Sequence, residues 1–234
     1  MKYGIINAMP EEMATLTKVM TASTVTDIQG IKFHEGTIYN QAVVVVESGI
    51  GKVRAGITTA LLISNFNVDA IINSGSAGAL GADLKIGDVV VATQTAYHDA
   101  DATAFGYEYG QVPQQPARFD ADRTLVADII AAAQQTNLKT VKGLIVTADV
   151  FVADAAKADQ IKKHFPDALS AEMEGAAVGQ VATLFKVPYV VVRAMSDNAD
   201  GDAGVTFDEF IETAGKQSAE MLLALFASKN TLQN

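Results

Sequence analysis

Short apolar runs alternate along the chain with segments in which apolar residues recur every three or four positions. The apolar runs predict strands over residues 3–8, 31–39, 42–47, 68–74, 88–96, 141–147, 168–171 and 188–194. The helical spacing predicts helices over residues 13–20, 60–66, 120–136 and 207–226, one around Ile161 and one directly after Gly175. Strands that alternate with helices throughout a chain are typical of helices packed on both faces of one sheet. We therefore expect an α/β fold, a three-layer α/β/α sandwich with a central mixed sheet.

Two of the predicted helices have a clear apolar set. After Gly175 the set is Ala177, Val178, Val181, Leu184 and Phe185. The closing helix is predicted to bury Phe210, Ala214, Met221 and Leu225.

The composition points to one soluble domain. The 234 residues are 49% hydrophobic and contain no linker-like segment, so we expect a single domain over residues 1–234. The 17 basic and 27 acidic residues give a net charge of −10, which opposes binding to nucleic acids and to anionic membranes. There is no cysteine, and the N-terminal segment lacks the length and cleavage site of a signal peptide. Since no stretch approaches the roughly 20 apolar residues of a membrane span, we expect a cytoplasmic protein.

Acidic side chains follow several of the predicted strands. Glu172 and Glu174 lie where a strand passes into a helix, and Asp197 and Glu12 each follow another strand. In open α/β sheets, ligands bind outside the carboxyl ends of the strands, so these carboxylates are expected to face one site. Each also has a simpler explanation. Glu12 and Glu172 can be favourable charges at a helix start, and Asp197 can be a cap.

Other strand ends carry glycines or an aromatic ring, without a nucleotide-binding motif. The segment SGIGKV at 48–53 lacks the first glycine of a P-loop, and Arg54 replaces the third glycine of a dinucleotide fingerprint. Its glycines are expected to form a tight turn, with Ile50 as an apolar wall. The segment GSAG at 75–78 would let a ligand approach the backbone closely. Phe151 is either part of the core or a ring that stacks on a flat ligand.

The segment 97–116 is long and rich in aromatic residues and turn formers. Its cluster HDAD at 98–101 suggests a metal site, but no second group of ligands accompanies it, so we expect no metal. Loops of this length are usually functional or cover a partner surface. We interpret Phe105, Tyr107, Tyr109 and Pro113 as part of an apolar flap or a subunit contact.

Six segments in order carry a resemblance to a known family. They are AMPEEM (8–13), SGIGKV (48–53), NSGSAG (73–78), YHDADATAFGYEYGQVP (97–113), SAEMEGAA (170–177) and VRAMSDNAD (192–200). Together they closely resemble the 5'-methylthioadenosine/S-adenosylhomocysteine nucleosidases of the nucleoside phosphorylase superfamily, and the likeness runs from residue 3 to about 226. The resemblance implies the nucleoside phosphorylase fold and a cofactor-free hydrolase. Its expected substrates are methylthioadenosine, S-adenosylhomocysteine and 5'-deoxyadenosine, cleaved between adenine N9 and the ribose.

The matching positions imply roles for individual residues. Asp197 resembles the general acid that protonates adenine N7, Glu12 the base that activates water, and Glu174 the residue that holds the ribose hydroxyls. Substrate contacts are implied for Met9, Ile50, Ser76, Ala77, Gly78, Phe151, Val152, Glu172, Met173, Arg193, Ser196 and Phe207. The second subunit of a homodimer is implied to contribute Ala102, Phe105 and Pro113.

Two positions depart from the family pattern. Ala102 is smaller than the branched residue often found there, and Asn7 replaces a small residue before Ala8. Both changes can alter the width of the channel for the 5' substituent. Neither touches the implied acid, base or ribose carboxylate.

Two other functions remain open on the sequence. A purine nucleoside phosphorylase uses phosphate as its nucleophile, and arginines suit the geometry of phosphate. The superfamily's phosphorylases carry an arginine where this chain has Ile-Ile-Asn at 71–73, and Glu11 and Glu12 would repel phosphate. A catalytically silent purine-binding protein would be expected to have lost Glu12 or Asp197, and both are present.

Overall fold

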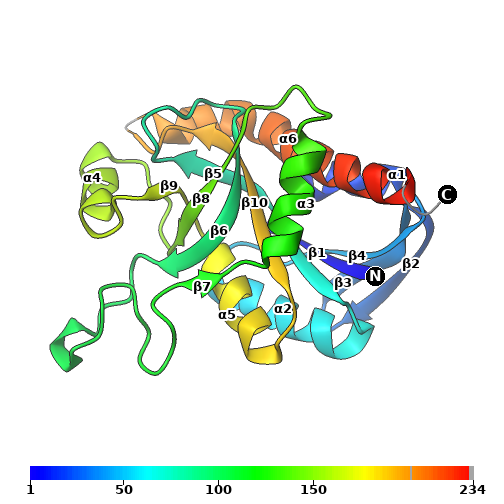
Figure 1. Cartoon of the computed structure of the whole chain (residues 1–234), viewed down its shortest axis with the longest axis horizontal. Helices are drawn as coiled ribbons and strands as arrows, with labels where there is room; N and C mark the ends of the chain where they lie inside the picture. The colour runs from blue at the N-terminus through cyan, green and yellow to red at the C-terminus, as the bar shows by residue number, and fades with distance from the viewer. Residues whose placement is uncertain (201, 232–234) are drawn as a thin grey trace.

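Ten strands form one mixed sheet with helices on both faces in the computed structural model, which describes residues 1–200 and 202–231 (Figure 1). The strands are β1 (Lys2–Asn7), β2 (Thr21–Ile28), β3 (Ile31–Ile38), β4 (Gln41–Glu47), β5 (Ala70–Ala79), β6 (Val89–Tyr97), β7 (Phe119–Asp120), β8 (Thr140–Thr147), β9 (Ala168–Glu172) and β10 (Tyr189–Asp197). The helices are α1 (Pro10–Val19), α2 (Lys52–Phe66), α3 (Arg123–Ala133), α4 (Ala155–His164), α5 (Gly175–Phe185), α6 (Ala203–Thr231) and the short 3-10 helix η1 (Thr103–Phe105). Residues 201 and 232–234 of the predicted domain lie outside the described part.

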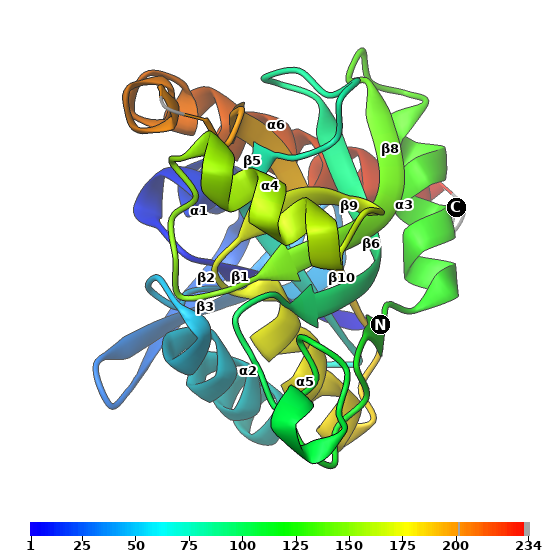
Figure 2. The same ribbon diagram turned by 90° about the vertical axis from the view of Figure 1, so that its left-hand side faces the viewer.

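The helices divide into two layers. Helices α1 and α3 both contact α6 on one side of the sheet, and α2 packs against α5 on the other (Figures 1 and 2). Helix α4 lies beside β8 and β9 at one end of the molecule (Figure 2). The predicted three-layer α/β/α architecture is therefore confirmed.

The sheet curves back on itself. Strand β10 pairs with β5 and with β6, β6 pairs with β8, β8 with β9, and β9 again with β5. These strands close a ring, from which β1, β4, β3 and β2 continue beyond β5. Strands β1, β5 and β10 run parallel to one another, so their carboxyl ends meet at the same edge. Glu12, just after β1, and Asp197, at the end of β10, both lie at that edge.

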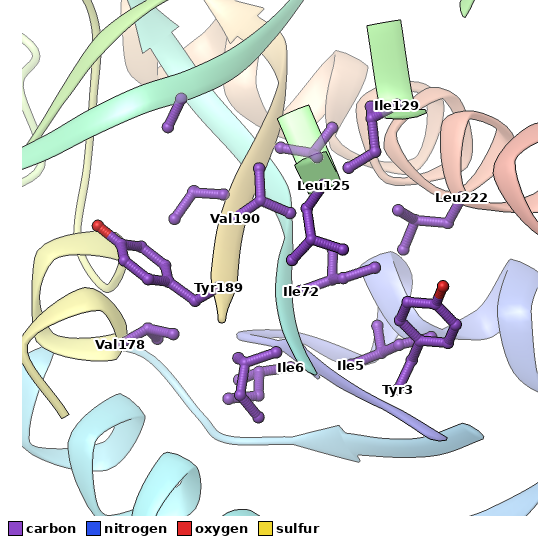
Figure 3. Packing of buried hydrophobic residues seen from close by; sticks show 14 of the residues in the cluster. Tyr3, Ile5, Ile6, Ile72, Leu125, Ile129, Val178, Tyr189, Val190 and Leu222 are labelled. Atoms are coloured by element: carbon purple, nitrogen blue, oxygen red, sulfur yellow. The ribbon is translucent and has the colours of Figure 1, made fainter. Parts of the chain in front are cut away.

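The apolar runs form the core as predicted. Every residue of β10 is buried, and the side chains of Val190, Ile72 and Ile5 lie between the two helical layers (Figure 3). On the side of α6, the ring of Tyr3 packs against that of Phe226 with 5.2 Å between centroids. Burial of one such side chain contributes about 1.5–3 kcal/mol, so the core fixes the strand ends firmly.

The sequence did not predict the short elements η1 and β7, nor strand β2. Seven of its eight residues are exposed, so it carries no apolar pattern to detect. It is held by antiparallel pairing with β3, which supplies backbone hydrogen bonds without burying side chains. The helix predicted over 60–66 begins earlier, at Lys52. The prediction missed its first turns because polar residues and Gly56 interrupt the apolar spacing there.

Three apolar side chains lie outside the core, contrary to what helical spacing suggests: Phe210 in α6, and Leu184 and Phe185 in α5. Phe210 is 36% exposed, so its predicted burial in the closing helix is wrong, whereas Ala214, Met221 and Leu225 are buried as predicted. In α5, Leu184 is 76% exposed. Among the described helices, none combines the length and the apolar character that a membrane span requires.

Candidate active site

The carboxyl ends of β1, β5, β9 and β10 border a cavity of about 310 Å³. The predicted residues in its walls are Met9, Glu12, Ile50, Ser76, Ala77, Gly78, Phe151, Val152, Glu172, Met173, Glu174, Ser196, Asp197 and Phe207. Ala8, Val150 and Ala171 also line it and were not predicted. The structure thus brings three carboxylates from distant parts of the chain, those of Glu12, Glu174 and Asp197, to one cavity.

Glu12 is held at the start of α1. Pro10 occupies the first turn, and the Glu12 carboxylate turns back to accept hydrogen bonds from the amides of Ala8 (2.8 Å) and Met9 (3.3 Å) through Oε2. Its Oε1 accepts from the amide (2.9 Å) and the hydroxyl (3.0 Å) of Ser76. The absence of a side chain at Gly75 is required, because a Cβ there would stand 2.6 Å from Oε1. The helix-start explanation and a place in the cavity therefore both apply to Glu12.

Asp197 ends β10 in a buried position. Its Oδ2 accepts a hydrogen bond from the hydroxyl of Ser196 (2.9 Å), and its Oδ1 accepts from the amide of Ala199 (2.8 Å). Burial raises the pKa of Asp197, although these hydrogen bonds act in the opposite direction. Gly78 leaves the carboxyl accessible, since a Cβ there would lie 2.8 Å from Oδ1. The site can hold a protonated acid.

Glu174 stands at the N-cap of α5 with its carboxylate turned away from that helix. Oε1 accepts a hydrogen bond from the amide of Gly51 (2.9 Å), and Oε2 lies 3.5 Å from Nη2 of Arg193. Burial, and next the charge of Glu172, raise the pKa of Glu174 to about 8. The carboxylate therefore loses its proton more readily when a cationic group or a hydrogen-bond donor enters the cavity.

Glu172 and Arg193 form a buried ion pair behind Glu174. Arg193 is buried outside the cavity wall and also donates to Oδ1 of Asn73 (2.6 Å). Glu172 lines the cavity, but both of its oxygens accept hydrogen bonds from protein groups: Oε1 from Thr147, and Oε2 from Arg193 and from the amides that begin α5. In this structure Glu172 and Arg193 support Glu174 and leave little of their own polar surface for a ligand.

Apolar side chains form the remaining walls. The rings of Phe151 and Phe207 meet edge to face, with centroids 5.5 Å apart. Phe151 is 45% exposed, so it is not a core residue, and the alternative of a ring available to a flat ligand fits better. Ile50 and Met9 add to the apolar lining of the cavity.

The sequence matches the model of the phosphorylase superfamily over residues 2–227. It is 48% identical over 225 residues to the 5'-methylthioadenosine/S-adenosylhomocysteine nucleosidase of Staphylococcus carnosus, which covers 96% of this chain and 99% of that protein. The solved structure of the nucleosidase from S. pneumoniae with the transition-state inhibitor MT-ImmA has a TM-score of 0.94 at 49% identity, covering 98% and 100% of the two chains. A putative methylthioadenosine nucleosidase from Weissella paramesenteroides is 57% identical, with a TM-score of 0.91 and 98% of both chains covered.

The chain belongs to the 5'-methylthioadenosine/S-adenosylhomocysteine nucleosidases of the phosphorylase superfamily. This membership confirms the resemblance carried by the six sequence segments and the fold that it implied.

The residues that the nucleosidase resemblance assigned to a second subunit lie away from the cavity of their own chain. Ala102, Phe105 and Pro113 belong to the segment between β6 and β7, whose helix η1 projects from the body of the molecule (Figure 1). Phe105 is 83% exposed. Large apolar side chains are also exposed on the neighbouring layer of α2 and α5, namely Val53, Ile57, Leu184 and Phe185.

The cluster at 98–101 has partners within this nucleosidase chain. Asp99 accepts a hydrogen bond from Nζ of Lys52 (2.6 Å), and Asp101 accepts from the amide and hydroxyl of Thr103. His98 is buried beneath the segment, and burial lowers its pKa. The two aspartates therefore serve the local structure of the loop.

Three supporting residues of the nucleosidase site were not predicted as such: Gly51, Asn73 and Thr147. The Gly51 contact uses a backbone amide, which leaves no trace in a sequence. Asn73 and Thr147 are polar residues within or at the end of buried apolar strands. Because a buried polar group requires a hydrogen-bond partner, that position is the signal that could have identified both.

Proposed function

We propose that this chain hydrolyses the N-glycosidic bond of 5'-methylthioadenosine and S-adenosylhomocysteine, and also of 5'-deoxyadenosine, to release adenine. The observation that carries the proposal is the convergence of Glu12, Glu174 and Asp197 on one cavity of about 310 Å³ in a member of this nucleosidase family. Apolar walls with a few converging polar groups are typical of a site for a small, flat ligand.

Asp197 acts as the general acid in this mechanism. Adenine is a poor leaving group until one of its ring nitrogens is protonated, and Asp197 donates its proton to N7. Burial raises the pKa of Asp197 and so favours the protonated form that this step requires. Phe151 and the backbone of Val152 hold the base in place.

The other two carboxylates act on the ribose side. As the bond to adenine breaks, the sugar acquires positive charge, which Glu174 stabilises while it holds the ribose hydroxyls. Glu12 takes the proton from the water that attacks C1'. Of the donors on Glu12, the Ser76 hydroxyl can rotate away, so water can take its place on Oε1.

No single group accounts for the rate. Positioned proton transfer contributes about 10²- to 10⁴-fold, whereas enzymes accelerate reactions by about 10⁶-fold or more. The acid, the base and the charge on Glu174 must therefore act together.

The cavity argues against a phosphorylase. Among the described residues, no lysine or arginine lines it, and the nearby Arg193 is already paired with Glu172. The segment 71–73, where the superfamily's phosphorylases carry an arginine, is Ile-Ile-Asn in this chain. Both polar atoms of the Asn73 amide have protein partners, because Nδ2 donates to the carbonyl of Ile6 (3.0 Å) while Oδ1 accepts from Arg193. A phosphate anion would face carboxylates instead of guanidinium groups.

A homodimer in the cytoplasm completes the proposal. The exposed apolar side chains of α2 and α5, together with Phe105, support a subunit contact in which Phe105 and Pro113 border the 5' channel of the partner, whereas Ala102, the third residue implied there, is buried in its own chain. Sedimentation should give twice the chain mass, and Phe105→Ala should raise the KM for methylthioadenosine. The cysteine-free sequence fits a reducing compartment.

The decisive experiment measures adenine release from methylthioadenosine and from S-adenosylhomocysteine, with and without phosphate. Equal rates in both buffers are expected for a hydrolase. Strict dependence on phosphate would identify a phosphorylase, and binding without release of adenine would identify a silent purine-binding protein.

A further inference from the structure

The N-terminus of helix α5 is capped by residues outside the helix. Glu174 occupies the N-cap position, where a side chain ordinarily accepts a hydrogen bond from the first turn. The Glu174 side chain makes no such bond, because its carboxylate reaches across the cavity to the amide of Gly51. Some other group must therefore satisfy the free amides of the first turn.

Thr147 and Glu172 supply the missing cap. Oγ1 of Thr147 accepts a hydrogen bond from the amide of Ala176 (2.8 Å). Oε2 of Glu172 accepts from the amides of Gly175 (2.7 Å) and Glu174 (3.1 Å). The two capping side chains are joined, since the Thr147 hydroxyl donates to Oε1 of Glu172.

The register of the sheet makes this arrangement possible. Thr147 ends β8 and lies opposite Glu172, the last residue of β9, in a parallel pair. Thr147 is fully buried and lies outside the cavity walls. It therefore reaches the site through Glu172 and the α5 backbone, without a contact of its own to a ligand.

We propose that Thr147 is a positioning residue of the active site: its hydroxyl caps α5 and anchors Glu172, which leaves the carboxylate of Glu174 free to hold the ribose. This inference rests on the proposed function for the role of Glu174. A hydroxyl has one donor and can accept as well, and both capacities of Thr147 are used here.

Removal of the hydroxyl has a defined consequence. The Ala176 amide is left unpaired in a buried place, and Oε1 of Glu172 loses the one donor that it has among the described residues. The Glu172 carboxylate is then held only through Oε2, and it is the main charged neighbour of Glu174. Binding of the ribose by Glu174 therefore weakens, whereas the contacts to adenine, made by Asp197 and Phe151, are unchanged.

The test compares Thr147→Val, which keeps the shape and removes the hydroxyl, with Thr147→Ser, which restores it. Thr95→Val is the matched control, because Thr95 is also a buried strand residue whose hydroxyl bonds a side chain, Tyr189 (3.1 Å), outside the cavity. Two ligands are titrated by calorimetry: adenine, which has no ribose, and a 7-deaza analogue of methylthioadenosine, which has the ribose but lacks the N7 that is protonated.

We expect Thr147→Val to raise the Kd of the nucleoside analogue about tenfold or more and to change the Kd of adenine less than twofold. The KM for methylthioadenosine should rise in parallel with the Kd of the analogue. Thr147→Ser and Thr95→Val should bind both ligands as the parent does. Three outcomes would overturn the assignment. They are an equal rise in Kd for both ligands, an unchanged Kd for the nucleoside analogue, and a serine variant that fails to restore binding.

A second variant keeps the test informative if Thr147→Val does not fold. Thr147→Cys retains a weak donor and acceptor, so a smaller loss confined to the nucleoside analogue is expected, and a loss shared with adenine contradicts the proposal. The outcome is separable from that of the proposed function. If the parent enzyme releases no adenine from methylthioadenosine, the function fails, while the binding comparison still decides the role of Thr147.

Discussion

Helices α1 and α5 both follow a buried strand and both place a glutamate in the cavity, but their first turns are closed in different ways. Glu12 of α1 accepts hydrogen bonds from Ala8 and Met9 ahead of its own helix. Glu174 of α5 makes no bond to its own first turn, which is closed by Thr147 and Glu172. The Glu12 carboxylate therefore closes its own helix as well as facing the cavity, whereas the Glu174 carboxylate leaves the start of α5 to other residues and bonds to Gly51 and Arg193 instead.

This difference separates function from stability in one active site. A change at Glu12 is expected to cost activity and folding free energy together, because the same oxygens cap the helix and face the substrate. A change at Glu174 should cost activity alone. Glu174 is also buried next to Glu172, and burial and the Glu172 charge both raise its pKa against the opposing charge of Arg193. Ionisation of Glu174 therefore opposes folding, and its replacement can even stabilise the protein.

The largest loss of catalytic rate is expected for a change at Asp197. This residue belongs to neither α1 nor α5, so it serves as the reference for the comparison of Glu12 with Glu174. Asp197→Asn keeps an acceptor for the Ala199 amide but has no proton to deliver. The kcat for methylthioadenosine should fall by about 10³- to 10⁴-fold with little change in Tm. Steady-state rates and a thermal melt measure both, and a near-normal kcat would show that the proton comes from another group.

The pair Glu12→Gln and Glu174→Gln tests the comparison directly. Each should lower kcat/KM by about 10²- to 10³-fold. Glu12→Gln should also lose about 1 kcal/mol of unfolding free energy, because its amide nitrogen must face one of the donors that the carboxylate accepts. Glu174→Gln keeps an oxygen for the Gly51 amide and should lose less than about 0.5 kcal/mol. Urea unfolding of both variants gives the difference, and equal destabilisation would refute it.

Two of the three cavity carboxylates could be brought together from the sequence for a simple topological reason. Glu12 follows β1 and Asp197 ends β10, and both strands run parallel to β5, so their carboxyl ends meet at one edge of the sheet. Glu174 follows β9, which pairs antiparallel with β5, so this argument does not cover it. The apolar runs themselves predicted the strands because their side chains are buried. Strand β2 was missed for the opposite reason, since its residues are almost all exposed.

The division of labour around α5 could not be predicted. The contact of Thr147 with Glu172 depends on the register of β8 and β9, which is set by packing and not by local sequence. The explanation of Glu172 as a charge at a helix start describes its hydrogen bonds correctly, while the same explanation fails for Glu174 two residues later. The local preference for acidic residues at a helix start cannot distinguish two glutamates that stand two residues apart.

Two glycine substitutions sharpen the comparison with a smaller effect. A Cβ on Gly75 would stand 2.6 Å from Oε1 of Glu12, whereas a Cβ on Gly175 would lie 3.1 Å from Oε1 of Glu172. Gly75→Ala must displace the base and should lower kcat/KM about 10- to 100-fold, because a displacement of about 1 Å is costly in catalysis. Gly175→Ala requires a shift of a few tenths of an ångström in a residue that acts through Glu174, so a loss of less than about threefold is expected. Steady-state rates rank the two, and the reverse ranking would contradict the assignment of the base.

The smallest effect is expected in the pH dependence of stability. The folded-state pKa of Glu174, about 8, lies above its ordinary value of 4.5 because of burial and the charge of Glu172. The unfolded chain therefore releases this proton first as the pH rises, so the contribution of Glu174 to stability is complete below pH 4.5 and is lost as the pH approaches 8. The Glu174→Gln variant has no such proton, and all its other titratable groups are the same as those of the parent protein. The Tm of the parent protein should thus fall relative to that of Glu174→Gln between pH 5 and pH 8, by several degrees. Thermal melts at matched pH values measure this gap, and a gap that stays constant would show that Glu174 is ionised throughout, as a carboxylate neutralised by Arg193 would be.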